Sequence, residues 1–127
     1  MIIKQSFETP LYRGRFIVMF SDYQVKISDH YDDLGYDKTI EYASFVLVNE
    51  TLESKVYGGY LIGFNIKYEH REITNGVIGH EVLHAAHALL KDRGLKLTDD
   101  SDEAYAYLIE WMTDKVYEVI EINNIKL

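Results

Sequence analysis

The amino-acid sequence predicts an α+β fold, with residues 1–127 forming one domain. Before Thr74, segments rich in β-branched and aromatic residues are typical of strands. After Thr74, apolar residues recur with the period of a helix. This single change of pattern favours a small, mostly antiparallel sheet of about four strands, followed by two helices. The sequence contains no linker, repeat or low-complexity segment that would indicate a second domain.

Four segments have the composition of strands, and an acidic loop interrupts them. The first two strands are expected at Arg15–Asp22 and Tyr23–Ser28, where a polar break between them makes a hairpin a candidate arrangement. An acidic loop is expected at Asp29–Lys38. The third and fourth strands are expected at Tyr42–Glu50 and Gly58–Glu69.

Two helices follow the strands. The first is expected from about Asn75 to Arg93 and is predicted to end at Gly94, a residue suited to the position just after a helix. The second is expected to begin near Asp100 and to end at about Ile122.

The composition excludes several classes of protein. The formal net charge is −8, which argues against nonspecific binding to nucleic acid or to an anionic membrane. The chain has no cysteine, so disulfide frameworks and cysteine-based zinc knuckles are excluded. No apolar run reaches transmembrane length, and the first residues lack the apolar segment of a signal peptide. We therefore expect a cytoplasmic protein.

The expected first helix carries a separate face of histidines. On a helical wheel of about 100° per residue with His80 at zero, His84 falls near 40° and His87 near 340°. The apolar residues of this helix lie on the opposite side of the wheel: Ile78, Val82, Ala85, Ala86 and Leu89. The histidines therefore lie outside the stripe that packs against the core.

The spacing within this face matches a metal-binding helix. Residues 80–84 read His-Glu-Val-Leu-His, so His80 and His84 lie one turn apart and both imidazoles can reach one ion. Glu81 follows the first histidine and is placed to deprotonate a water molecule on that ion. The sequence therefore predicts a zinc site with His80 and His84 as ligands and Glu81 as general base.

A catalytic zinc ion needs a third protein ligand and an open position. Glu103 on the second helix is the favoured ligand, and Glu110 is the alternative, either as a ligand or as an acceptor that orients a histidine. His87 is a weaker candidate because it lies about 10 Å from His80 along the helix axis, and its favoured role is to pack or to support the metal ligands. Tyr107 shares the face of Glu103 and is a candidate donor to an oxyanion.

Plainer interpretations of the same residues also remain open. Asp100 and Glu103 have the spacing of a capping box, in which Glu103 would only close the start of the helix. The acidic stripe that contains Glu103 and Glu110 is also typical of a solvated surface. Tyr107 has the alternative role of a packing residue.

With these residues in place, the second half of the chain resembles the gluzincin class of zinc metallopeptidases. The resemblance rests on HEVLH at 80–84 and DEAYAY at 102–107, and on the spacing between them. More closely, FETPLYRGRFIVMF, GHEVLHAAHALLKDRG and DEAYAYLIEWM look like small metallopeptidases encoded by bacteriophages and prophages. The resemblance implies a protein located in the cytoplasm of a bacterial host or associated with the virion.

The same resemblance implies the roles of particular residues. His80, His84 and Glu103 would be the zinc ligands, and Glu81 the general base. A small sheet would pack on the active-site helix, and its edge strand would hold an extended peptide by strand addition. Gly58–Glu69 is the candidate for that edge strand, and an ordinary strand inside the sheet is the alternative interpretation of this segment.

The expected function is therefore the hydrolysis of peptide bonds in a specific protein substrate by zinc-activated water, with zinc as the only cofactor. The acidic composition favours a substrate with basic residues. One alternative is a zinc-binding interaction or structural protein of a phage that lacks efficient catalysis. Another is a metal-free α+β module in which the histidine motif occurs by chance. A structural zinc ion needs no general base and is usually closed by a fourth protein ligand, so Glu81 favours the enzyme.

Overall fold

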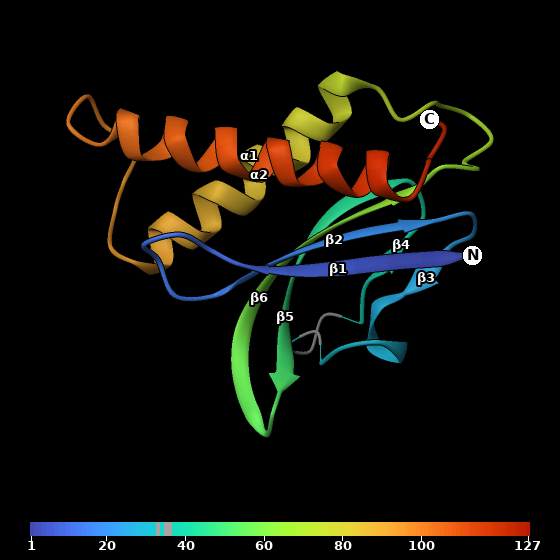
Figure 1. Ribbon diagram of the computed structural model, residues 1–127, viewed down its shortest axis with the longest axis horizontal. Coiled ribbons are helices and arrows are strands. Elements are labelled where there is room, and N and C mark those ends of the chain that lie inside the picture. The colour runs from blue at the N-terminus through green and yellow to red at the C-terminus, as the bar shows by residue number, and fades with distance from the viewer. Residues whose placement is uncertain (33, 35–36) are drawn as a thin grey trace.

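The computed structural model describes residues 1–32, 34 and 37–127, and its main sheet has four strands. Across the sheet the order is β1 (Ile2–Glu8), β2 (Arg15–Ser21), β6 (Lys55–Asn65) and β5 (Ala43–Leu52) (Figure 1). The β1–β2 and β5–β6 pairs are antiparallel, whereas β2 and β6 run parallel. The expected α+β fold with a mostly antiparallel sheet is confirmed.

The expected hairpin of Arg15–Asp22 with Tyr23–Ser28 is wrong. Only β3 (Val25–Lys26) forms in the second segment, and it pairs with β4 (Thr39–Ile40) in a separate two-stranded sheet. A 3-10 helix at Ile27–Asp29 follows β3. The acidic loop predicted at 29–38 includes residues 33, 35 and 36, which lie outside the described residues.

Local contacts after β2 explain why no hairpin forms there. The carboxylate of Asp22 accepts a hydrogen bond from the N-terminal ammonium of Met1 at 2.7 Å. The Ser21 hydroxyl donates to the carbonyl oxygen of Tyr23 at 2.8 Å. Both sides of β2 are already paired, one with β1 and the other with β6, so no side of β2 is left for a hairpin partner.

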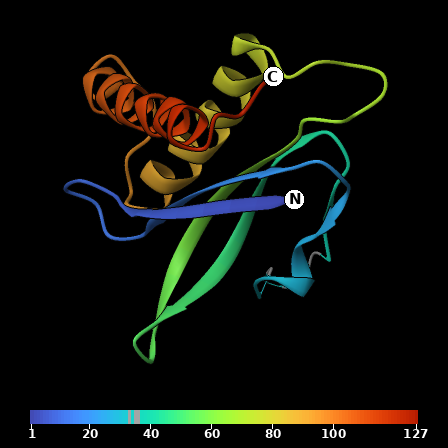
Figure 2. The same cartoon turned by 45° about the vertical axis from the view of Figure 1, so that its right-hand side comes forward.

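Both helices cover the same face of the main sheet (Figures 1 and 2). α1 (Asn75–Asp92) packs on β5 and β6, and α2 (Asp102–Ile122) packs on β2 and on α1. Both helix predictions are confirmed to within two residues, including the end at Gly94, whose φ is +80°. No helix among the described residues is long and apolar enough to cross a membrane.

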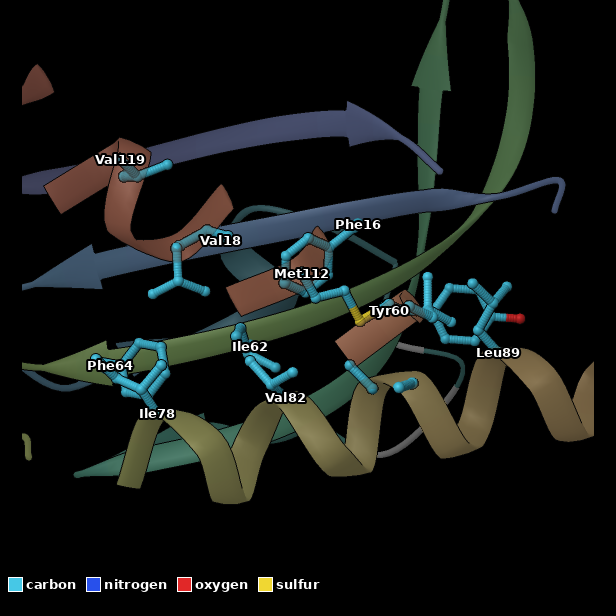
Figure 3. Close-up of a cluster of buried hydrophobic side chains, with 14 of the residues drawn as sticks. Phe16, Val18, Tyr60, Ile62, Phe64, Ile78, Val82, Leu89, Met112 and Val119 are labelled. Carbon is cyan, nitrogen blue, oxygen red and sulfur yellow. The ribbon is translucent and has the colours of Figure 1, made fainter. Parts of the chain in front are cut away.

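The main core lies between the two helices and the sheet (Figure 3). Phe64 of β6 is fully buried and stacks on Phe20 of β2, with ring centroids 5.2 Å apart. Trp111 of α2 contacts the edge of the Phe7 ring of β1 at a centroid distance of 6.3 Å. A smaller apolar cluster covers the opposite face, where β3, the 3-10 helix and β4 lie.

A buried phenol links β6 to the end of α1. The Tyr60 hydroxyl donates a hydrogen bond to the Asp92 carboxylate at 2.6 Å, and Tyr60 is only 4% exposed. Burial, followed by this hydrogen bond, raises the pKa of Tyr60 to about 12. The folded protein therefore favours the neutral phenol.

This raised pKa predicts a loss of stability in alkali. The contribution of Tyr60 is complete below about pH 10 and is lost as the pH rises from about 10 to about 12, where only the unfolded chain ionises. The loss reaches roughly 3 kcal/mol. Urea unfolding at several pH values should show a slope, in which the free energy of unfolding falls as the pH rises from about 10 to about 12. Tyr60→Phe should reduce this slope. An identical slope in the Phe variant would contradict the assignment.

Candidate metal centre and adjoining clefts

The local structure of α1 fixes the direction of its histidines. The Thr74 hydroxyl caps the helix by accepting a hydrogen bond from the backbone N–H of Val77 at 3.2 Å. The buried side of α1 is the predicted apolar stripe, extended by Val77, Glu81 and Leu90. His80 and His84 are exposed, so the prediction that these two side chains lie outside the apolar stripe is confirmed.

The two histidines face each other across one turn of α1. The Nε2 atoms of His80 and His84 lie 3.2 Å apart, and the ring centroids are separated by 4.8 Å. The Glu81 carboxylate joins them, because one ligand atom from each of the three residues lies within 4.8 Å of the others. The sequence motif therefore folds into a compact group of two imidazoles and a carboxylate.

Glu81 is nearly buried but keeps access to a cleft. The residue is 7% exposed, and its carboxylate has no hydrogen-bond partner among the described residues. No fully buried side-chain oxygen in the described chain lacks a partner, so the Glu81 oxygens must touch solvent. That solvent lies in two adjoining clefts, both lined by Glu81. Such a carboxylate is positioned to accept a proton from a molecule bound there.

The two clefts meet at His80 and Glu81 and at Ala43, the first residue of β5. One has a volume of about 300 Å³ and extends from His80 and Glu81 towards Tyr42 and Arg71. The other has a volume of about 420 Å³ and is lined by His80, Glu81 and His84 together with Lys38, Ala43, Ser44 and Phe45. The group therefore lies at the junction of two spaces large enough for side chains.

β5, and not β6, is the edge strand beside this group. The prediction that Gly58–Glu69 forms the edge is wrong, because β6 lies between β2 and β5. Residues 59–65 of β6 are buried without interruption, which is typical of a strand covered on both faces. The free edge nearest to the histidines belongs to Ala43–Leu52.

Alternate residues of β5 direct their backbone groups away from the sheet. The carbonyl oxygen of Tyr42 accepts a hydrogen bond from the backbone N–H of Asn65 in β6, so the backbone groups of Tyr42 point towards β6. The backbone groups of every second residue from Ala43 onwards therefore point away from β6. Two outward contacts agree with this pattern: the Phe45 carbonyl oxygen accepts from the Lys38 ammonium at 3.3 Å, and the Asn49 N–H donates to Asp32. The outward backbone groups of Ala43, Phe45 and Leu47 therefore form an edge that a further strand could pair with.

The structure does not bring the predicted α2 residues into the group. Glu103, Glu110 and Tyr107 are exposed, and neither glutamate joins His80 and His84 in a group of close ligand atoms. Tyr107 is 67% exposed and lines neither of the two clefts.

The structure also tests the capping role considered for Glu103 and the packing role considered for His87. The N-cap of α2 is Ser101, which makes no side-chain capping bond, so the capping box of Asp100 and Glu103 does not form. The ring centroid of His87 lies 6.3 Å from that of the buried Tyr105, which agrees with a packing role.

Two larger clefts lie elsewhere, with volumes of about 630 Å³ and about 730 Å³. The first contains Glu50, whose carboxylate accepts from Ser6 at 2.5 Å and from Arg15 at 3.3 Å. Burial, and then the Glu50 charge, raises the pKa of Tyr31 in this cleft to about 12. The hydrogen bonds that Glu50 accepts explain why this carboxylate is buried. We therefore take the histidine group as the candidate functional site because of the chemistry of its side chains, although its clefts have smaller volumes.

Sequence patterns gave no signal for Lys38, Tyr42 or Arg71. These residues lie outside the metal motif and reach the site only through the fold. No protein-family model, curated protein or solved structure matches the chain. The case for a function therefore depends on the geometry of the site itself.

Proposed function

We propose that this protein is a zinc-dependent peptidase whose metal is held by His80 and His84. The observation that carries the proposal is the 3.2 Å separation of the two Nε2 atoms. Two nitrogen ligands at about 2.0–2.1 Å from a tetrahedral zinc ion lie roughly 3.3 Å apart. The imidazoles therefore already have the spacing that one shared zinc ion requires.

Glu81 is the proposed general base. When bound, zinc would act as a Lewis acid that acidifies a water molecule and polarises a peptide carbonyl. The Glu81 carboxylate opens onto both clefts and would take the proton of the attacking water. The protonated Glu81 would then give this proton to the leaving amine.

The edge of β5 is the proposed support for the substrate backbone. An extended peptide that pairs with Ala43, Phe45 and Leu47 would run beside the histidine pair, because Ala43 and Phe45 line the same cleft as His80 and His84. Pairing at Phe45 requires the Lys38 ammonium to leave the carbonyl oxygen that it contacts. Backbone pairing of this kind would hold the scissile bond beside the histidine pair.

Glu103 remains the proposed third ligand, with Glu110 as the alternative. Both lie on the exposed side of α2, so ligation requires the start of α2 to approach the histidines when metal binds. The Ser101 side chain makes no capping bond to the helix, but its hydroxyl donates to the Lys96 carbonyl oxygen and accepts from the Thr98 backbone N–H, so these loop contacts would have to change in such a movement.

The metal content of purified protein tests this proposal. We expect about one zinc ion per wild-type chain and none in His84→Ala, because a single remaining imidazole cannot hold the ion. His87→Ala is the matched control, since it removes an exposed histidine of the same helix that lies outside the group. Zinc content that is equal in wild type and His84→Ala would refute the assignment.

A further inference from the structure

The smaller of the two clefts has a cationic end that the proposed reaction does not use. This cleft has a volume of about 300 Å³ and extends from His80 and Glu81 towards Tyr42 and Arg71. Arg71 belongs to the segment that joins β6 to α1 (Figure 1). This volume is large enough to take one amino-acid side chain. A substrate residue next to the scissile bond would enter this space.

The Arg71 guanidinium is held in place by stacking. Its central carbon lies 5.3 Å from the centroid of the Tyr42 ring, within the range of a cation–π contact. The Tyr42 hydroxyl donates to the carbonyl oxygen of Glu72 at 2.7 Å, and the ring packs against Tyr68 with centroids 4.9 Å apart. These contacts orient the guanidinium before any ligand arrives.

The same guanidinium has no acidic partner among the described residues. Glu69 and Glu72 flank Arg71 in the sequence, yet neither carboxylate lies within 4.0 Å of it. Among the described residues, Glu81 supplies the only carboxylate that lines this cleft, from the second turn of α1. The hydrogen-bonding edge of Arg71 is therefore available to an anion.

We propose that Arg71 and Tyr42 form a subsite for a substrate carboxylate, an inference that rests on the proposed peptidase function. The carboxylate would come from an aspartate or glutamate side chain or from the C-terminus of the peptide. Arginine suits this group because its planar guanidinium binds both carboxylate oxygens at once. The overall charge of −8 predicts the opposite preference, but a contact within the cleft acts at shorter range than the surface field.

Binding of small carboxylates tests the subsite independently of catalysis. The probes are acetyl-glutamate amide for a side chain, acetyl-alanine for a C-terminus, and neutral acetyl-glutamine amide as the reference. The readout is the NMR signal of the Arg71 Nε–H group, in both zinc-loaded and chelator-treated protein. We expect at least one carboxylate to bind about tenfold more tightly than the neutral amide. The tighter of the two acids identifies the source of the carboxylate.

Matched variants distinguish this subsite from general attraction of anions. Arg71→Gln should abolish the preference for carboxylate, whereas Lys67→Gln should keep it, because Lys67 is an exposed cation of the same segment outside the cleft. Equal binding of acid and amide to wild type would overturn the proposal. So would a preference that survives in Arg71→Gln.

A cleavage profile links the subsite to the reaction. In a mixture of peptides treated with zinc-loaded protein, sites with Asp, Glu or a C-terminal carboxylate at one fixed position should be enriched about tenfold. The enrichment should vanish in Arg71→Gln and persist in Lys67→Gln. Cleavage by wild type without this enrichment would refute the subsite. No cleavage at all would refute the peptidase, and the binding experiment would then decide on the subsite alone.

Discussion

Glu81→Gln is expected to reduce peptide hydrolysis by about 10²–10⁴-fold while the protein keeps its zinc. The amide has nearly the shape of the carboxylate but cannot accept the proton of the attacking water. His80 and His84 are unchanged in the variant, and Glu81 is not a proposed ligand. The measurement is mass-spectrometric detection of peptide cleavage, together with metal analysis of the same samples.

Glu121→Gln is the matched control for this experiment. Glu121 is an exposed carboxylate on α2, outside the group and both clefts, so its loss should leave hydrolysis unchanged. Equal activity in wild type and Glu81→Gln would contradict the role of Glu81. A zinc-loaded wild type with no detectable hydrolysis would favour the zinc-binding interaction protein instead.

Phe64→Ala is expected to lower the free energy of unfolding by about 3–5 kcal/mol. Phe64 is completely buried between the sheet and α1 (Figure 3). Its ring stacks on that of Phe20. Removing the ring leaves a cavity beneath the helix that carries the histidines. Because a domain of this size is stabilised by only about 5–15 kcal/mol, the variant should unfold at much lower urea concentration.

Val56→Ala on the same strand is the control for this effect. Val56 is 64% exposed near the tip of the β5–β6 hairpin, so the change should cost less than about 0.5 kcal/mol. A loss below about 1 kcal/mol in Phe64→Ala would mean that the helices do not pack on the sheet through this ring.

The helices could be predicted well because their signals are local. The apolar stripe of α1 follows from residue spacing alone, and Gly94 marks its end through a backbone conformation that favours glycine. The close approach of His80 and His84 follows from the same spacing, since residues four apart lie on one face.

The strands were harder to predict because their pairing depends on distant contacts. β1 was missed since its residues Lys4, Gln5 and Ser6 give no alternation of polar and apolar positions. The edge position of β5 depends on the parallel pairing of β2 with β6, which strand composition does not reveal. The cationic end of the cleft depends on Arg71, whose stacking on Tyr42 appears only in the folded chain.

The third ligand marks the limit of sequence analysis within the site. A helical wheel places Glu103 and Glu110 on one face of α2, but it carries no information on how α2 crosses α1. In the structure both glutamates are exposed and separate from the histidine group.

Anomalous X-ray diffraction at the zinc edge, from crystals of zinc-loaded protein, would show whether His80 and His84 hold the ion. We expect one strong peak per chain, about 2.0–2.1 Å from the Nε2 atoms of both histidines, with a carboxylate of α2 as a further ligand. A peak at another position, or none near these two atoms at full zinc occupancy, would contradict the proposed site. The group on α1 would then be a pair of exposed histidines beside a buried glutamate.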